Sequence, residues 1–195
     1  MIKMSELSET ELFDEQLEKA KNLHGEVCGG IVSGTKMAIH AMKELNMDFN
    51  QKKNKDLIVF LEIDRCMADA IQAVTGCSLG KRTLKLKNYG KFAATFYKIS
   101  TGEAIRIASN KNEKSEYPEE TIEEKIKRVK STPSEELFNI QKVKIKIDEN
   151  ELPGRPRDEK FCSICSEQIM DSKQSLVSGR PVCKSCHEGS YYEII

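Results

Sequence analysis

Residues 62–81 read EIDRCMADAIQAVTGCSLGK, and the apolar run LIVFLEI at 57–63 leads into them. The apolar run predicts a buried strand, because it is short, continuous and rich in branched side chains. Residues 64–74 predict a short helix, which Thr75-Gly76 ends. This stretch therefore predicts a strand followed at once by a helix, and the rest of the chain is interpreted around it.

The same stretch carries two thiols and a carboxylate. Cys66 falls in the first turn of the predicted helix, and Asp69 lies three residues later on the same helix face. Cys77 follows the end of the helix, where the chain can fold back toward the strand. Two thiols and a carboxylate are therefore expected to gather where a strand, a helix and a loop meet. The ordinary alternative is that the cysteines are small buried apolar residues.

On the amino-terminal side, a capping box at 8–11 predicts a helix that continues to about residue 23. The sequence HGEVCGG follows and places His24 and Cys28 just before a second predicted helix, at about 29–45. Small residues along the buried stripe of that helix permit close approach of another helix. Cys28 stands at the helix N-terminus, where free N–H groups favour a thiolate.

On the carboxyl-terminal side, residues 82–108 predict strands joined by tight turns, which indicate an antiparallel meander. A charged helix is predicted from Pro118, and Thr132-Pro133 introduces another short helix. The alternating run KVKIKID at 142–148 predicts an edge strand. Together these elements predict an α+β fold, with helices packed on an antiparallel or mixed sheet.

Composition limits the classes of function. The chain has 195 residues, with 31 basic and 31 acidic side chains, so its net charge is zero and gives no general attraction to nucleic acid or anionic membranes. No apolar run approaches the length of a membrane span, and the acidic, polar N-terminus does not resemble a signal peptide. We therefore expect a reducing cytoplasmic location, where seven cysteines favour metal binding or thiol chemistry over disulfides.

The composition changes near residue 150. We predict an α+β core domain at 1–149, a linker at 150–160, which contains two prolines and a glycine, and a small domain at 161–195. The last segment is too short to be held together by apolar burial alone.

A four-cysteine motif fills this small domain. Cys162-x2-Cys165 and Cys183-x2-Cys186 are separated by 17 residues, which is the spacing of a structural Zn²⁺ site. The sequence CKSCH at 183–187 also matches the attachment motif of c-type haem. We reject haem because no export signal is present and the upstream cysteine pair would have no role. His187 replacing Cys186 as a ligand is the less favoured arrangement.

The charge of residues 151–195 bears on their partners. Six bases and seven acids give a net charge of −1 without a basic stripe, so nucleic acid is a poor partner for this domain. We expect a structural or protein-contact role. Apolar residues available for contact are Leu176, Val177, Tyr191, Tyr192, Ile194 and Ile195.

Several motifs resemble the family of the formylmethanofuran dehydrogenase E subunit. They are HGEVCGG, CMADAIQAVTGCSLGK, NYGKFAATFY and TGEAIRI, and the four-cysteine module resembles the zinc finger that some members carry. The resemblance covers most of residues 20–108 and then 161–192. It implies a methanogenesis-related protein whose α+β core forms an intertwined homodimer, with a treble-clef zinc finger.

The resemblance also implies a shared polar or metal site in the core. The matching residues here are His24, Cys28, Cys66, Asp69 and Cys77. The family commonly has HGH before its first cysteine, whereas this chain has Glu26 in place of the second histidine. Because carboxylate is a harder ligand than imidazole, the identity and occupancy of a second metal ion in the core stay open.

Three functions follow from these features. The first is a zinc-binding homodimer that accompanies or regulates a larger oxidoreductase complex and is not catalytic on its own, since the chain lacks a phosphate-binding loop and iron–sulfur spacing. The second is a metalloenzyme that uses the core site, with Asp69 or Glu26 as general base. The third is a zinc-finger transcriptional or metal-sensing regulator, against which the missing basic surface argues.

Overall fold

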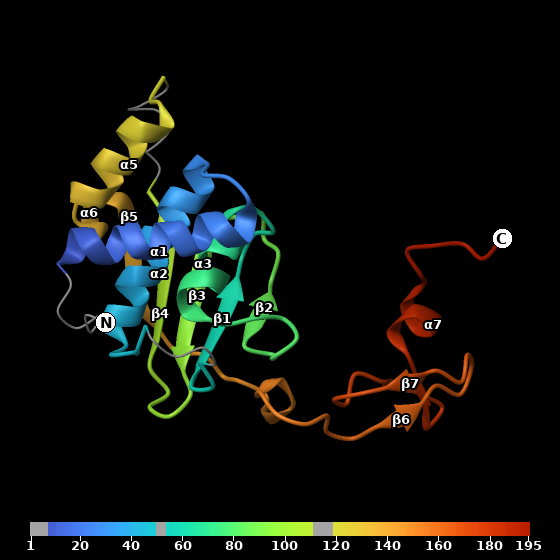
Figure 1. The fold of residues 1–195 in the computed structure, drawn as a ribbon. Coiled ribbons are helices and arrows are strands. Elements are labelled where there is room, and N and C mark those ends of the chain that lie inside the picture. The colour runs from blue at the N-terminus through green and yellow to red at the C-terminus, as the bar shows by residue number, and fades with distance from the viewer. Residues whose placement is uncertain (1–7, 50–53, 111–118) are drawn as a thin grey trace. The chain divides into compact units, whose positions relative to one another are not determined.

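A computed structural model describes residues 8–49, 54–110 and 119–195. Its internal contacts divide the chain into unit 1, Met1–Lys146, and unit 2, Ile147–Ile195 (Figure 1). The predicted boundary after residue 149 lies close to this division and stays a prediction. No helix among the described residues combines the length and the apolar character that a bilayer crossing requires.

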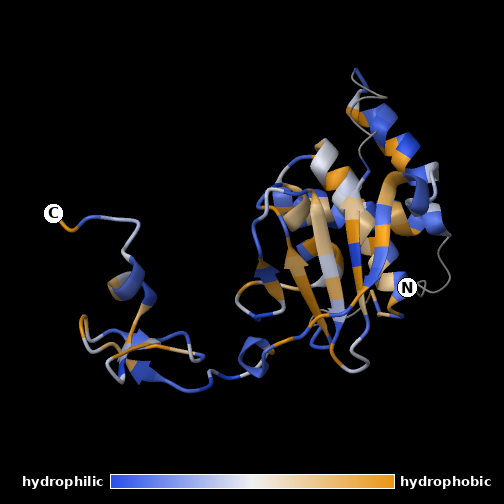
Figure 2. Ribbon diagram, turned by 180° about the vertical axis from the view of Figure 1, so that it is seen from behind, coloured by the Kyte–Doolittle hydropathy of each residue, from blue (hydrophilic) through white to orange (hydrophobic). Residues whose placement is uncertain are grey.

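Unit 1 is built on a five-stranded sheet with the order β2-β1-β3-β4-β5. Its strands are β1 (Leu57–Leu61), β2 (Leu84–Leu86), β3 (Ala93–Lys98), β4 (Ala104–Ser109) and β5 (Phe138–Val143). β1 and β2 are parallel, and the other neighbouring strands are antiparallel. The central strands are largely hydrophobic (Figure 2). The sheet is therefore mixed, which confirms the predicted α+β class.

Helices of unit 1 cover one face of this sheet. They are α1 (Glu9–His24), α2 (Gly29–Glu44), α3 (Met67–Thr75), α5 (Ile122–Ser131) and α6 (Ser134–Leu137). Figure 1 shows α1, α2 and α3 lying across the sheet. Fully buried Phe13 and Met37 from the helices belong to the same hydrophobic core as Phe96 and Ile107 from the strands. The core thus lies between the helices and one sheet face.

The predicted antiparallel meander is wrong for its first strand. β2 pairs with β1 in parallel, with Val59 opposite Leu84, and it does not pair with β3. The reason is α3, which returns the chain to the starting end of β1, so that the next strand must run in the same direction. β3 occupies the other edge of β1, with Val59 opposite Phe96. β3 and β4 form an antiparallel hairpin as predicted, and β5 pairs with β4 only after α5 and α6.

The predicted edge strand at 142–148 is displaced toward the N-terminus. The observed strand β5 ends at Val143, which pairs with Ala104 at the first position of β4. Beyond Val143 the strand has no partner left in β4, and residues 144–148 are not in a strand. The end of β5 is therefore determined by the length of the neighbouring strand β4 and not by the alternation of lysine with apolar residues.

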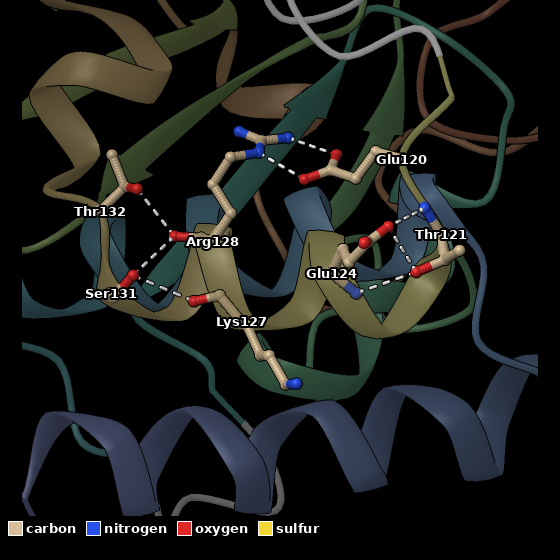
Figure 3. A network of polar contacts seen from close by, with 7 residues as sticks. All are labelled: Glu120, Thr121, Glu124, Lys127, Arg128, Ser131 and Thr132. Carbon is tan, nitrogen blue, oxygen red and sulfur yellow. Dashed lines mark hydrogen bonds and ion pairs between the residues drawn. The ribbon is translucent and has the colours of Figure 1, made fainter.

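Helix starts follow the local chemistry. The capping box at the start of α1 is confirmed, because Ser8 Oγ accepts from the Glu11 N–H at 3.3 Å and the Glu11 carboxylate accepts from the Ser8 N–H at 2.9 Å. The predicted start of the charged helix at Pro118 lies outside the described residues. Helix α5 begins at Ile122 with a second capping box, formed by Thr121 and Glu124 (Figure 3).

Two further contacts fix α5. Arg128 forms a bidentate ion pair with Glu120, with Nε–Oε1 at 2.6 Å and Nη2–Oε2 at 2.8 Å (Figure 3). Val129 is buried against the core, and Lys130 pairs with Asp14 of α1. These contacts hold Lys125, on the same helix, in a defined place beside α2.

A partly buried ion pair anchors the chain between β1 and α3. Arg106 on β4 donates two hydrogen bonds to Glu62, with Nε–Oε1 at 2.7 Å and Nη2–Oε2 at 2.8 Å. The hydrogen bond from Arg106 holds the pKa of Glu62 below its usual value. The carboxylate is therefore ionised at neutral pH, and the pair restrains the segment that leads to Cys66.

Helices α2 and α3 approach very closely. A Cβ atom built on Gly34 would lie 2.9 Å from Ala70 Cβ and 3.0 Å from Met67 Cα, which is closer than real side chains approach. Only glycine fits at this position. The small residues on the predicted buried stripe of α2 thus do face a helix, and that helix is α3.

Unit 2 is small and poorly supplied with apolar contacts. It contains two hairpins, β6 (Lys160–Phe161) with β7 (Gln168–Ile169) and β8 (Ser175–Val177) with β9 (Arg180–Val182). A short 3-10 helix, η2 (Glu149–Glu151), precedes them, and α7 (Lys184–Glu188) follows. Among its described residues, the hydrophobic core has only Cys162, Ile169 and Val182 as buried members. Unit 2 therefore needs a further source of stability.

Candidate metal centres

Four cysteines come together in unit 2, in what we call the four-cysteine site. Cys162 and Cys165 lie in the turn between β6 and β7, while Cys183 caps α7 and Cys186 lies within that helix. Their sulfur atoms all lie within 4.8 Å of one another. His187 does not belong to this group, although it follows Cys186 directly. The site could bind a metal ion through four thiolates.

The electrostatics of the four-cysteine site fit a cation. Backbone N–H groups of Cys165, Cys183 and Ile164 lower the pKa of Cys162 to about 6. In contrast, the pKa of Cys186 is raised to about 12 by hydrogen bonding to Cys183, by burial and by the other thiols. Four thiolates this close repel one another unless a cation sits among them, so the donor set suits a soft divalent ion.

A second group lies in unit 1 and joins the ends of three helices; we call it the unit 1 centre. It consists of His24, the last residue of α1, Cys28, the N-cap of α2, and Cys66, the N-cap of α3. One ligand atom from each lies within 4.8 Å of the others. Gly25 makes this possible, because its φ of 103° turns the chain sharply between α1 and α2.

Asp69 supports this centre from the first turn of α3. Its Oδ2 lies 2.7 Å from His24 Nδ1, although the two residues are 45 positions apart in the sequence. A histidine that donates Nδ1–H to a carboxylate presents its Nε2 lone pair to a metal ion. Cys66 faces the other thiol, and its pKa is raised by hydrogen bonding to Cys28 and by burial. This set offers one nitrogen and two sulfur ligands.

Cys77 is not brought into the unit 1 centre, contrary to the expectation that it joins the other thiols. It is fully buried beyond the opposite end of α3, and its thiol donates to the Leu57 carbonyl at 3.6 Å. Burial raises the pKa of the Cys77 thiol. Nine helical residues separate the two ends of α3 by roughly 13 Å, which is too far for one metal ion. Glu26 is exposed and also lies outside the group.

Sequence reasoning missed a cavity of about 600 Å³ in unit 1, next to the unit 1 centre. Its lining includes Gly29 and Gly30 at the start of α2, Arg65 just before Cys66, and Lys125 from α5. Gly29 and Gly30 belong to the motif HGEVCGG, and Arg65 belongs to the stretch at 62–81. Lys125 had no local signal, because only the packing of α5 beside α2 brings it there.

Comparisons with known proteins give three similarities. The family model described as "FmdE, Molybdenum formylmethanofuran dehydrogenase operon" matches residues 23–139, which include all five predicted core-site residues. A "Probable S-adenosyl-L-methionine-binding protein" of Archaeoglobus fulgidus is 26% identical over 202 aligned positions. The alignment covers 92% of this chain and 54% of that protein, so the chain spans about half the length of this curated relative.

A solved structure shares the fold. It is a protein from Syntrophus aciditrophicus that is described as similar to FmdE, the E subunit of a tungsten formylmethanofuran dehydrogenase. The TM-score is 0.62 and the sequence identity 23%, and the superposition covers 93% of this chain and 95% of that one. At this identity the likeness shows a common fold.

Proposed function

Because this chain belongs to the FmdE family, we propose that it is a zinc-binding member with a structural ion in unit 2 and a second ion in the unit 1 centre. The observation that carries the proposal is the meeting of His24, Cys28 and Cys66 at three helix ends, with Asp69 bonded to the histidine. A ligating histidine held by a carboxylate is the usual arrangement in protein zinc sites.

The two centres differ in the number of ligands. Four cysteines complete a tetrahedral zinc site and leave no position for substrate, so the unit 2 ion has a structural role. The unit 1 centre supplies three ligands and leaves one position open. A zinc ion with an open position acts as a Lewis acid toward a bound oxygen or carbonyl group. In this chain Asp69 would orient His24, and the two cysteines would bind as thiolates.

The unit 1 centre can be tested by metal counting. We expect purified wild-type protein to contain two zinc ions per chain, and His24→Ala or Cys66→Ser to contain one. Asp69→Asn should weaken zinc binding at this centre by about 10- to 100-fold, because the imidazole loses its orienting partner. Elemental analysis gives the counts, and competition with a chromogenic chelator gives the affinity.

The control for these variants is Cys77→Ser, which changes a cysteine outside both centres and should keep two ions. One ion per chain in the wild type, lost in Cys162→Ser and unchanged in His24→Ala, would refute a metal in the unit 1 centre and leave only the structural zinc.

We further propose that the protein is a homodimer that accompanies or regulates a larger oxidoreductase complex. The family description, which refers to an operon of formylmethanofuran dehydrogenase, supports such a setting. Unit 2 presents large apolar side chains that suit protein contact, since Phe161 is 67% exposed and Leu176 is 72% exposed.

We expect light scattering of the pure protein to give a mass of about 44 kDa, twice its chain mass of 22.1 kDa.

In a pull-down from extracts of the native source, the full-length protein should retain a component of an oxidoreductase, identified by mass spectrometry. Phe161→Ser combined with Leu176→Ser should abolish this capture, whereas Leu79→Ser, which alters an equally exposed residue of unit 1, should not. Capture that is the same for all variants, or the absence of any oxidoreductase, would contradict the accessory role.

A metalloenzyme is the second candidate, and a centre with only three ligands, next to residues that line a cavity, favours it. Asp69 already holds His24, so it would position that ligand, and a general base would have to come from elsewhere. A zinc-finger regulator stays the weakest candidate because residues 151–195 carry a net charge of −1.

A further inference from the structure

The cavity at the amino-terminal end of α2 is lined by basic, polar and apolar residues. Two cationic side chains line it, Arg65 from the segment before α3 and Lys125 from α5, and none of its described lining residues is acidic. Ile63 and Phe92 add apolar wall. Its volume of about 600 Å³ lies within the range of small-molecule sites. A concave site with two cations and an apolar wall suits an anion that has an apolar body.

The backbone of α2 adds to this preference. Gly29 and Gly30 line the cavity, and the first N–H groups of a helix have no acceptor within it. The side chain of the N-cap, Cys28, makes no capping hydrogen bond to them, and the first turn contains no acidic residue. The helix dipole therefore adds its positive end to the field of Arg65 and Lys125.

The cavity adjoins the unit 1 centre. A Cβ atom built on Gly30 would lie 3.8 Å from Cys28 Sγ and 3.0 Å from Cys66 Cβ, and one built on Gly29 would lie 3.6 Å from Lys125 Nζ. The two cysteine side chains thus lie close to Gly30, and the ammonium group of Lys125 lies close to Gly29. A ligand in the cavity would have its charged group at the start of α2, beside the thiols.

We propose that this cavity binds a small organic anion, a carboxylate or a phosphate ester, through Arg65, Lys125 and the N–H groups of Gly29 and Gly30. The proposal rests on the proposed function in one respect, because it names the class of ligand that the unit 1 centre would meet. Anion binding itself requires only the geometry of the cavity.

The test is NMR titration of the ¹⁵N-labelled full-length protein. The probes are benzoate, phenyl phosphate and the neutral benzamide, which share an aromatic ring and differ in charge. We expect saturable shifts of the Gly29 and Gly30 amide signals with benzoate, phenyl phosphate or both, and none with benzamide. The anion that binds more tightly shows whether the site suits a carboxylate or a phosphate.

Variants localise the binding. Lys125→Gln and Arg65→Gln should each weaken anion binding about tenfold, since each removes a charged hydrogen-bond donor. Lys127→Gln changes an exposed lysine of the same helix and should leave binding unchanged. The absence of saturable shifts with both anions at millimolar concentration, equal shifts with benzamide, or unchanged affinity in both cavity variants would overturn the proposal.

Metal counting separates this outcome from the proposed function. Two zinc ions per chain without anion binding would refute only the cavity proposal. Anion binding by a wild-type chain that holds a single zinc would refute only the second metal site.

Discussion

Replacing Cys162 by serine is expected to unfold unit 2 and to lower the zinc content of the full-length protein from two ions per chain to one. Cys162 is 2% exposed, and its sulfur accepts hydrogen bonds from the N–H groups of Ile164 at 3.5 Å and Cys183 at 3.3 Å. It therefore organises the turn in addition to serving as a ligand of the proposed ion. Structural zinc contributes about 10–16 kcal/mol of apparent binding free energy in modules of this kind. The few buried apolar residues of unit 2 cannot replace that contribution.

Elemental analysis measures the zinc content, and limited trypsin digestion shows which part is unfolded. Cleavage should spread through 147–195 while the helices and strands of unit 1 stay protected, because unit 1 has its own core. Thorough chelation of the wild type should give the same digestion pattern. Cys77→Ala is the matched control and should retain both ions. A Cys162→Ser protein with an ordered, protease-resistant unit 2 would contradict the structural role of the metal.

Gly34→Ala is expected to destabilise unit 1 by about 2 kcal/mol, even though alanine is the better helix former. The added Cβ would stand 2.9 Å from Ala70 Cβ and 3.0 Å from Met67 Cα. One of these contacts is with backbone, which cannot rotate away, so α2 and α3 must separate. The melting temperature should fall by roughly 4–8 °C in calorimetry.

The same substitution should affect the unit 1 centre, because Cys28 and Cys66 begin the two helices that are forced apart. Chelator competition should show weaker zinc binding there, while the four-cysteine site stays occupied. Gly29→Ala is the control for stability in the same helix, since its Cβ would meet Lys125 at an ordinary 3.6 Å. A Gly34→Ala protein as stable as wild type would show that the helices can relax without cost.

Local patterns in the sequence were sufficient for most elements of the fold. The capping box at Ser8, the small residues of α2 and the glycine that ends α3 act over a few residues, so they can be interpreted without knowing the rest of the chain. The two errors in the sheet have a different origin. The pairing of β2 with β1 and the end of β5 at Val143 depend on neighbouring strands, which local alternation does not encode.

The candidate sites divide in the same way. The four cysteines of unit 2 occur in two close pairs, and the spacing alone predicts that they meet. Sequence by itself therefore determined the metal motif, the main helices and strands, and the thiols available to the core. Only the tertiary structure decided that Cys66 lies beside Cys28 and His24 while Cys77 is kept away by the length of α3, and that Lys125 lies beside the start of α2. The physical reason is that contacts between distant segments depend on how the whole core packs, whereas caps, turns and ligand pairs depend on their immediate neighbours.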